Sequence, residues 1–265
     1  RVIDIDIEVD NIGPVQGMSG WKDRLDAQNR PLFGAIIKPK SGLNMEQYMS
    51  IVKDMIYGGA DFIKEDEIMA QNLYLPLEKR VEAVEHLKNI SGWKGFFAYC
   101  INADPMELLG NIKKIHYHTC TSNIVGGCHI NFWSGLGAYT TARGFDIATH
   151  YQRSGIRILT DPSNKYSISW PVLVKLGCMA GIDSMHVGML GGYYPEGESE
   201  EETLEAISIC EKYDVIPSLS CGMNPVLARE IKERIGNNFM ASVGGWLHTG
   251  DSLIKKVKEM RESLD

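Results

Sequence analysis

The chain has 265 residues, of which 44% are hydrophobic and 23% are charged, a composition that fits a folded globular domain and excludes a disordered or collagen-like chain. Its formal net charge is −7, and no stretch gathers the lysine and arginine that a nucleic acid or an anionic membrane surface requires. Apolar runs such as Phe33–Ile37 are much shorter than the roughly 20 residues that cross a bilayer. We therefore expect a soluble protein that binds neither nucleic acid nor a membrane.

From residue 32 onward, short β-branched or aromatic runs alternate with segments of helical period, which is typical of repeated βα units around a parallel sheet. The predicted strands span, in chain order, Leu32–Lys38, Asp61–Lys64, Gly95–Asn102, Gly127–Asn131, Ile156–Asp161, Ser184–Val187, Val215–Ser220 and Phe239–Val243. The predicted helices span Asn44–Tyr57, Leu77–Lys88, Pro105–Tyr117, Thr140–Arg153, Trp170–Met179, Glu200–Tyr213, Pro225–Ile235 and Asp251–Glu262. This pattern predicts an α/β fold, the (β/α)8 TIM barrel, over residues 32–265. Residues 1–31 are expected to be an opening segment or the remainder of a missing N-terminal domain.

Six cysteines are scattered along the chain, namely Cys100, Cys120, Cys128, Cys178, Cys210 and Cys221. Their spacing matches no zinc-binding motif, and several lie in apolar runs where a buried thiol packs well. We therefore expect reduced thiols, a cytoplasmic protein and no zinc site.

Polar residues or glycines stand at or just after the predicted strand ends. They are Lys38, Lys40, Lys64, Asp66, Glu67, Asn102, Asn131, Asp161, His186, Ser220, Gly222, Gly244 and Gly245. Because the active sites of TIM barrels lie where the strands end and the βα loops begin, these residues are expected to face one opening. For Asn102, Asn131 and Ser220, an ordinary polar loop explains each residue equally well.

The segment Lys64-Glu-Asp66-Glu67 places a lysine beside carboxylates that could hold a hard cation such as Mg²⁺. A lysine ammonium cannot ligate a cation. It gains an anionic oxygen if its amine, with a pKa lowered by burial, reacts with CO₂ to give a carbamate. Taken alone, Lys64 is explained more simply as a salt-bridge partner of its acidic neighbours, so both interpretations stay open at this point.

Two motifs in the chain resemble those of the RuBisCO family. The letters KPKSGL, which begin at Lys38, resemble its KPKxGL motif, and GGADFIKEDE, which begins at Gly58, resembles its GGLDFxKDDE motif at the right distance downstream. Weaker similarity runs from Gly13–Gly17 to Val243-Gly-Gly245 and so covers nearly the whole chain. The chain therefore resembles the C-terminal catalytic barrel of the RuBisCO superfamily.

This resemblance implies roles for residues at matching positions only. Lys64 would be the carbamylated lysine, and Asp66 and Glu67 the carboxylate ligands of Mg²⁺, while Glu65 stands where the family more often has Asp. Lys38 would transfer a proton near the bound substrate, with Lys40 as its companion from the same motif. The cofactors implied are Mg²⁺ and the CO₂ of the carbamate.

The resemblance also implies residues that bind the substrate. His186 would face it from the sixth strand. A cradle for a phosphate would be formed by the Ser220 hydroxyl and by backbone amides at Gly222, Gly244 and Gly245, where no Cβ blocks the approach. Asn102 and Asp161, at their predicted strand ends, are further candidates for substrate or phosphate binding.

Two departures from the family pattern bear on the reaction. Carboxylases carry a His-Arg pair after the fifth strand, whereas Leu159-Thr-Asp161-Pro-Ser-Asn-Lys165 has no arginine, so a bisphosphate substrate is not expected. The sixth loop, from His186 to Gly197, lacks the lysine with which the family stabilises the carboxylated intermediate. Together these departures make the chain most similar to the RuBisCO-like proteins of the form IV type.

The resemblance thus implies a Mg²⁺-dependent enzyme that enolises or isomerises a sugar-phosphate-like carbonyl substrate through a metal-stabilised enediolate. Its partner would be a small, phosphorylated molecule, and family analogy suggests a homodimer. One alternative is a divergent ribulose-bisphosphate carboxylase in which Lys165 or another residue replaces the missing arginine. Another is a noncatalytic barrel that binds or scaffolds, with the acidic triad as a structural ion cluster. Aldol-type cleavage uses the same enediolate and stays open.

Overall fold

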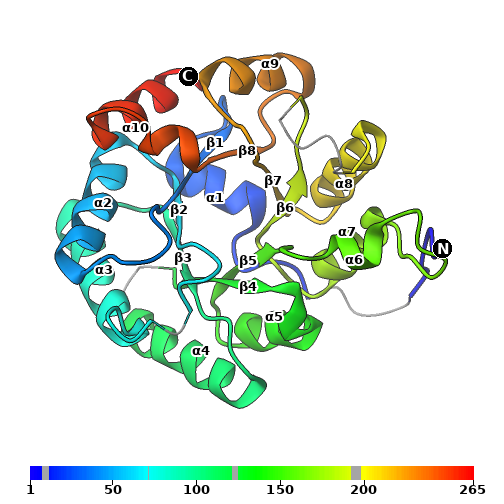
Figure 1. Ribbon diagram of the computed structural model, residues 1–265, viewed down its shortest axis with the longest axis horizontal. Coiled ribbons are helices and arrows are strands. Elements are labelled where there is room, and N and C mark those ends of the chain that lie inside the picture. The colour runs from blue at the N-terminus through cyan, green and yellow to red at the C-terminus, as the bar shows by residue number, and fades with distance from the viewer. Residues whose placement is uncertain (8–11, 71, 121–124, 192–197) are drawn as a thin grey trace.

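The computed structural model describes residues 1–7, 12–70, 72–120, 125–191 and 198–265. Within these residues, eight parallel strands form a closed barrel in which each strand pairs with the next in sequence and β8 pairs with β1 (Figure 1). The closure is in register, since Leu32 lies opposite Met240 and Gly34 opposite Ser242. The predicted TIM barrel is therefore confirmed.

The strands span β1 Leu32–Ile36, β2 Phe62–Lys64, β3 Phe96–Cys100, β4 Gly127–Asn131, β5 Ala148–Gln152, β6 Ser184–Gly188, β7 Ile216–Leu219 and β8 Met240–Val243. The helices span α1 Gly17–Leu25, α2 Met45–Gly58, α3 Leu77–Ser91, α4 Pro105–Thr119, α5 Leu136–Gly144, α6 Arg157–Thr160, α7 Trp170–Met179, α8 Glu200–Lys212, α9 Pro225–Ile235 and α10 Leu253–Glu262. Short 3₁₀ segments, Phe132–Ser134 and Gly245–His248, follow β4 and β8. Within the described residues, no helix is both long and apolar enough to cross a bilayer.

The predicted fifth strand, Ile156–Asp161, is wrong, and so is the second half of the helix predicted over Thr140–Arg153. The helix ends at Gly144, and Asp146 takes a left-handed conformation with φ 53° that turns the chain into β5. The segment 156–161 instead contains the single helical turn α6. In β5 the outward Tyr151 packs in the helix-facing core, and the inward His150 contacts the rings of Phe62 and His186 inside the barrel.

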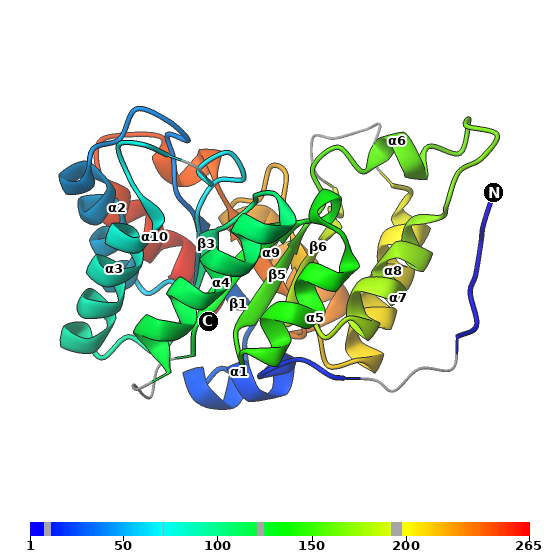
Figure 2. The same ribbon diagram turned by 90° about the horizontal axis from the view of Figure 1, so that it is seen from below.

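The lower end of the barrel is filled by apolar side chains from alternate strand positions and from α1. They are Met18, Trp21, Ala27, Leu32, Phe62, Phe96, Ala98, Ala148, Ile216 and Met240. The Trp21 ring stacks on Phe96 with centroids 5.1 Å apart, and Phe62 meets Phe96 edge-on. Figure 2 shows α1 beneath the strands, at the end opposite to α6. The segment before β1 thus supplies part of the barrel's floor.

A buried carboxylate fixes the approach to α1. Asp183, just before β6, accepts hydrogen bonds from the backbone N–H groups of Val15, Gln16 and Gly17 at 3.3, 2.8 and 3.1 Å. It also accepts one from the N–H of Thr149, at 3.1 Å. A Cβ at Gly17 would lie 2.4 Å from an oxygen of Asp214, so glycine is required where this segment meets the barrel.

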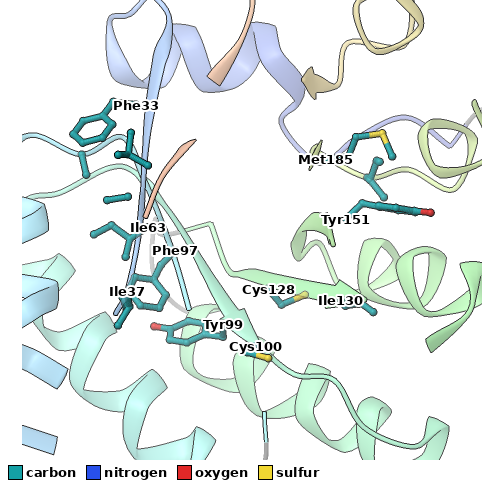
Figure 3. Close-up of a cluster of buried hydrophobic side chains, with 14 of the residues drawn as sticks. Phe33, Ile37, Ile63, Phe97, Tyr99, Cys100, Cys128, Ile130, Tyr151 and Met185 are labelled. Carbon is teal, nitrogen blue, oxygen red and sulfur yellow. The ribbon is translucent and has the colours of Figure 1, made fainter. Parts of the chain in front are cut away.

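The second and larger core lies between the strands and the surrounding helices. Outward strand residues such as Phe33, Ile63 and Met185 are fully buried there (Figure 3). Because these positions alternate with inward ones, each strand serves both the helix-facing core and the barrel interior. The upper ends of the inward rows remain for polar residues, and these form the candidate site.

Candidate active site

A cavity of about 700 Å³ opens at the carboxyl ends of the strands. Eight of the predicted site residues line it, namely Lys38, Lys64, Glu67, His186, Ser220, Gly222, Gly244 and Gly245. They come from β1, β2, β6, β7 and β8 or from the loops directly after them. The structure therefore brings together the core of the predicted constellation.

Five of the residues expected to face this opening do not appear in its lining, namely Lys40, Asp66, Asn102, Asn131 and Asp161. Lys40 is exposed. Asp66 is buried just behind the cavity wall. Asn102 bonds to backbone groups, donating to the carbonyl oxygen of Glu67 at 3.3 Å and accepting from the N–H of Asn131 at 2.7 Å. Asp161 follows α6 rather than a strand, and its carboxylate accepts from the Ser163 N–H and hydroxyl. The prediction that Asp161 ends the fifth strand is wrong.

Lys64 ends β2 with its side chain buried inside the barrel, 1% exposed. Its Nζ donates to the carbonyl oxygen of Glu65 at 3.0 Å and lies 3.6 Å from Oε2 of Glu67. Burial lowers the pKa of Lys64, although the nearby carboxylate of Glu67 acts in the opposite direction. Lowering the pKa increases the fraction of neutral amine, which is the nucleophilic form.

The two predicted carboxylate ligands flank this lysine. Asp66 is paired with the Nζ of Lys38, which reaches across from the end of β1. Glu67 is partly exposed, and its Oε1 accepts a hydrogen bond from the Ser154 hydroxyl at 3.2 Å. Desolvation opposes the charge of Glu67, but Lys64 and the hydrogen bonds outweigh it and lower the pKa of this carboxyl. Glu67 therefore lies beside Lys64, and Asp66 is near enough for its charge to act on the pKa of that lysine.

Glu65, between these residues in sequence, faces the helices instead. Its carboxylate is fully buried and pairs with Arg80 of α3, which is also fully buried. The Tyr48 hydroxyl donates to Oε1 at 2.6 Å and the Cys100 N–H donates to Oε2 at 2.7 Å. Lys64 thus points into the barrel and Glu65 toward the helices, where it anchors the segment that carries the site.

His186 lines the opposite side of the cavity from β6. Its Nδ1 lies 3.1 Å from the Ser218 hydroxyl and 3.3 Å from the Ser220 hydroxyl, and Ser218 also bonds to Ser242 at 2.7 Å. Burial lowers the pKa of His186 well below its usual value, with the charge of Lys64 as a further cause. The ring is therefore neutral near pH 7 and available as a hydrogen-bonding group.

The predicted glycine cradle lies at the ends of β7 and β8. Gly222 has φ 91°, which favours glycine. A Cβ at Gly245 would meet no protein atom within 4 Å, and one at Gly244 would make ordinary contacts at 3.7 Å with Ile36 and Lys38. Gly245 thus borders open space in the cavity, where a ligand can approach its backbone closely, whereas Gly244 lies against Ile36 and Lys38.

Cys221 is a non-glycine residue with φ 80° within this loop. A side chain in this conformation destabilises the folded state by about 1 kcal/mol or more. Glycine removes this strain, but it also loses more conformational entropy on folding, which offsets part of the gain. We expect Cys221→Gly to raise the free energy of unfolding slightly, by about 0.5 kcal/mol. Urea unfolding measures this change. The matched control is Cys120→Gly, where φ is −64° and no strain is relieved, so that a gain there would contradict the explanation.

Sequence reasoning missed the residues that follow β5. Gln152, Arg153, Ser154 and Arg157 all line the cavity. The predicted fifth strand begins at 156 and the observed one at 148, eight residues earlier, so the prediction that no arginine follows this strand concerns the wrong segment. That conclusion is wrong, since Arg153 directly follows β5. Gly144, the last residue of α5, is the signal that could have found it.

Arg153 is held by two neighbours. Its Nη2 donates to Oε2 of Glu198 at 2.6 Å, and its guanidinium lies over the Trp170 ring, 4.7 Å from the centroid. Its other terminal nitrogen, Nη1, has no hydrogen-bond partner within the described part of the chain. The cavity lining contains four cationic side chains, Lys38, Lys64, Arg153 and Arg157, against the carboxylates of Glu67 and Glu198. Its charge favours an anionic ligand.

Comparison with known proteins identifies the family. A family model described as the catalytic domain of the ribulose bisphosphate carboxylase large chain matches residues 17–250. The chain belongs to this RuBisCO family. It is 27% identical over 283 aligned residues to a ribulose bisphosphate carboxylase of Archaeoglobus fulgidus, covering 96% of the chain and 63% of that protein. It is 30% identical over 207 residues to a 3-oxo-isoapionate-4-phosphate decarboxylase of Rhizobium rhizogenes, covering 74% of the chain and 47% of that protein.

The barrel fold is also found by structural comparison. A crystal structure of a RuBisCO-like protein from Burkholderia fungorum superposes with a TM-score of 0.84 at 23% identity, over 99% of the chain and 68% of that protein. At this identity the likeness shows the barrel fold alone. The chain spans less than two thirds of the length of both named enzymes, so their activities are not transferred with the family.

Proposed function

We propose that this RuBisCO-family barrel is a Mg²⁺-dependent enzyme that enolises or isomerises a phosphorylated carbonyl substrate. The observation that carries the proposal is the placement of Lys64, buried at the end of β2, with Glu67 3.6 Å from its amine and the buried Asp66 two residues further on, paired with Lys38. The glycine cradle and the two arginines of the cavity lining, Arg153 and Arg157, support a phosphorylated substrate.

The donor set fits a hard cation only with a modified lysine. Among the described residues, no group of three or more His, Cys, Asp or Glu side chains is placed to hold a metal ion. Asp66 and Glu67 offer two carboxylates, and a carbamate on Lys64 would add a third anionic oxygen donor of the kind Mg²⁺ prefers. In forming it, the neutral amine adds to CO₂ and releases one proton. Bound there, Mg²⁺ would supply Lewis-acid stabilisation of negative charge that develops on the substrate oxygens.

The chain's own residues supply the rest of the reaction. Lys38, in its neutral form, would accept the proton from the carbon next to the substrate carbonyl, and its pairing with Asp66 places it at the same edge of the cavity. Neutral His186, bonded to Ser218 and Ser220, would hold a substrate hydroxyl or carbonyl oxygen. The backbone at Gly244 and Gly245 would bind the phosphate.

One specific observation favours a second candidate, a divergent carboxylase. Arg153 stands after β5 and lines the cavity, so a residue able to bind a second phosphate is present without recourse to Lys165. Against this candidate, the chain has no lysine between Lys175 and Lys212, the stretch that contains the sixth loop. Enolisation needs no such lysine, and we therefore prefer it.

The proposal predicts solvent exchange at the substrate carbon. With Mg²⁺ and bicarbonate, the protein should catalyse deuterium incorporation into at least one of a panel of ketose phosphates, measured by NMR. Lys38→Ala should reduce the rate by roughly 10²-fold or more, because it removes the proton acceptor. An exposed lysine of α3 provides the control, Lys79→Ala.

Three outcomes of this experiment differ in meaning. Exchange that survives in Lys38→Ala would contradict the role given to Lys38. Absence of exchange with every ketose phosphate would contradict the proposed reaction. Incorporation of labelled CO₂ into an acid product from ribulose bisphosphate would favour the carboxylase instead.

A further inference from the structure

Glu67 needs help to hold its orientation. It follows β2 in a loop, its side chain is 35% exposed, and its nearest cation, the Lys64 amine, is 3.6 Å away. At that distance and exposure, an ion pair constrains a flexible carboxylate only weakly. Its main chain is better fixed, since the carbonyl oxygen of Glu67 accepts from Nδ2 of Asn102 at 3.3 Å and from Sγ of Cys100 at 3.4 Å.

The carboxylate itself is held from the other side of the cavity. The Ser154 hydroxyl, 87 residues away in sequence, lies 3.2 Å from Oε1 of Glu67. Ser154 in turn lies 2.8 Å from Nε2 of Gln152, the last residue of β5. These three side chains form a chain of hydrogen bonds from the barrel interior to the loop that carries the acidic residues.

The direction of this chain is set by chemistry. An amide nitrogen only donates, so Gln152 occupies a lone pair of the Ser154 oxygen. An ionised carboxylate only accepts, so the single hydroxyl proton of Ser154 is directed at Glu67. Gln152 is 7% exposed and its backbone is part of a strand, which gives the relay a rigid base. A hydrogen bond to a charged acceptor is also stronger than a neutral one.

We infer that Ser154 and Gln152 are positioning residues, which hold the Glu67 carboxylate in the orientation that binds a divalent cation. This inference rests on the proposed function, in which Glu67 is a ligand. It extends the site to the end of β5 and gives Ser154 and Gln152 a role that does not require contact with the substrate. Partners that orient ligands from outside typically change metal affinity 10- to 100-fold when they are removed.

The test measures Mg²⁺ affinity by titration calorimetry in bicarbonate buffer, together with the thermal unfolding temperature of the metal-free protein. Ser154→Ala should weaken Mg²⁺ binding by roughly tenfold or more. Ser154→Thr, which keeps the hydroxyl, should bind Mg²⁺ about as tightly as the parent protein. Gln152→Met, which keeps the length of the side chain but removes the donor, should weaken binding to a smaller extent. The matched control is Ser163→Ala, which removes a hydroxyl of the same β5–α7 segment that bonds to Asp161.

The outcomes separate this inference from the proposal beneath it. If the unaltered protein binds Mg²⁺ and Ser154→Ala binds it equally well, the positioning role is wrong and the proposed function stands. If Ser154→Thr binds as weakly as Ser154→Ala, the hydroxyl is not the cause, and the inference again fails. If the unaltered protein binds no Mg²⁺ with bicarbonate present, the proposed function and this inference fail together. Should Ser154→Ala not fold, Gln152→Met decides, because unchanged affinity in that variant overturns the relay.

Discussion

Replacing Lys64 by methionine is expected to abolish bicarbonate-dependent binding of Mg²⁺. Methionine retains an unbranched side chain of similar length in the buried channel but has no amine, so no carbamate can form. Only Asp66 and Glu67 then remain of the proposed ligand set, and Asp66 stays paired with Lys38. Titration calorimetry in the presence and absence of bicarbonate measures the effect. Deuterium exchange into a ketose phosphate should be lost as well.

The control for Lys64→Met is Lys79→Met, on the exposed face of α3, which should bind Mg²⁺ as the parent protein does. A charged lysine is costly to bury, and the Glu67 carboxylate, 3.6 Å away and 35% exposed, offsets this cost only in part. The variant should therefore unfold at a temperature no lower than the parent. Mg²⁺ binding that is unaffected by this change, or that never depended on bicarbonate, would contradict the carbamate. The barrel would then be better explained as a binding or scaffold protein.

The second large effect is expected at Arg80. Arg80→Met should lower the free energy of unfolding by about 3 to 5 kcal/mol, because it leaves the Glu65 carboxylate charged and buried without its partner. The loss is large because Arg80 also donates from Nε to the Leu75 carbonyl oxygen at 2.8 Å, which fixes the loop before α3. Urea unfolding followed by circular dichroism measures the change. Mg²⁺ affinity should fall too, since Glu65 lies between Lys64 and Asp66.

The double variant Arg80→Met/Glu65→Leu provides the control. Replacing both members of a buried pair by apolar groups removes the uncompensated charge, and most of the stability should return. The Tyr48 hydroxyl and the Cys100 N–H lose an acceptor in that variant, so recovery should be incomplete. A double variant as unstable as Arg80→Met alone would show that packing of the arginine, rather than its charge, is what stabilises the segment.

The sequence predicted the fold and the inward-facing constellation because both depend on short-range patterns. The motif beginning at Gly58 marks the turn, the strand and the acidic residues in one continuous segment, and β4 and α7 were predicted to the residue. The error at β5 has a local cause. Ile156, Ile158 and Leu159 are β-branched or apolar residues of the kind found in strands. In a strand, Ile156 and Ile158 would face the same side, but here Ile156 is buried and Ile158, on a helical turn, is 68% exposed.

What the sequence did not reveal are pairings between distant segments. Ser154 and Glu67 lie in different βα units, 87 residues apart in sequence. Arg80 and Glu65 are 15 residues apart, on either side of the loop between β2 and α3, and no periodicity connects either pair. The same holds for Asn102, whose position was predicted from its strand but whose contacts are to backbone groups of its neighbours. Neighbouring residues in the sequence indicate which strand a residue belongs to. Its hydrogen-bond or ion-pair partner depends on how the strands, helices and loops pack together in three dimensions.

The apolar floor built from Trp21, Phe62 and Phe96 has a consequence for traffic through the protein. These side chains fill the lower end of the barrel, and the cavity opens at the other end, where the strands finish. The proposed substrate and cation, and the CO₂ proposed to cap Lys64, would enter the cavity past Lys38, Arg153 and Arg157. A bound substrate would block the access of CO₂ and the cation to Lys64. This favours an order in which Lys64 is modified and the cation is bound before the substrate arrives.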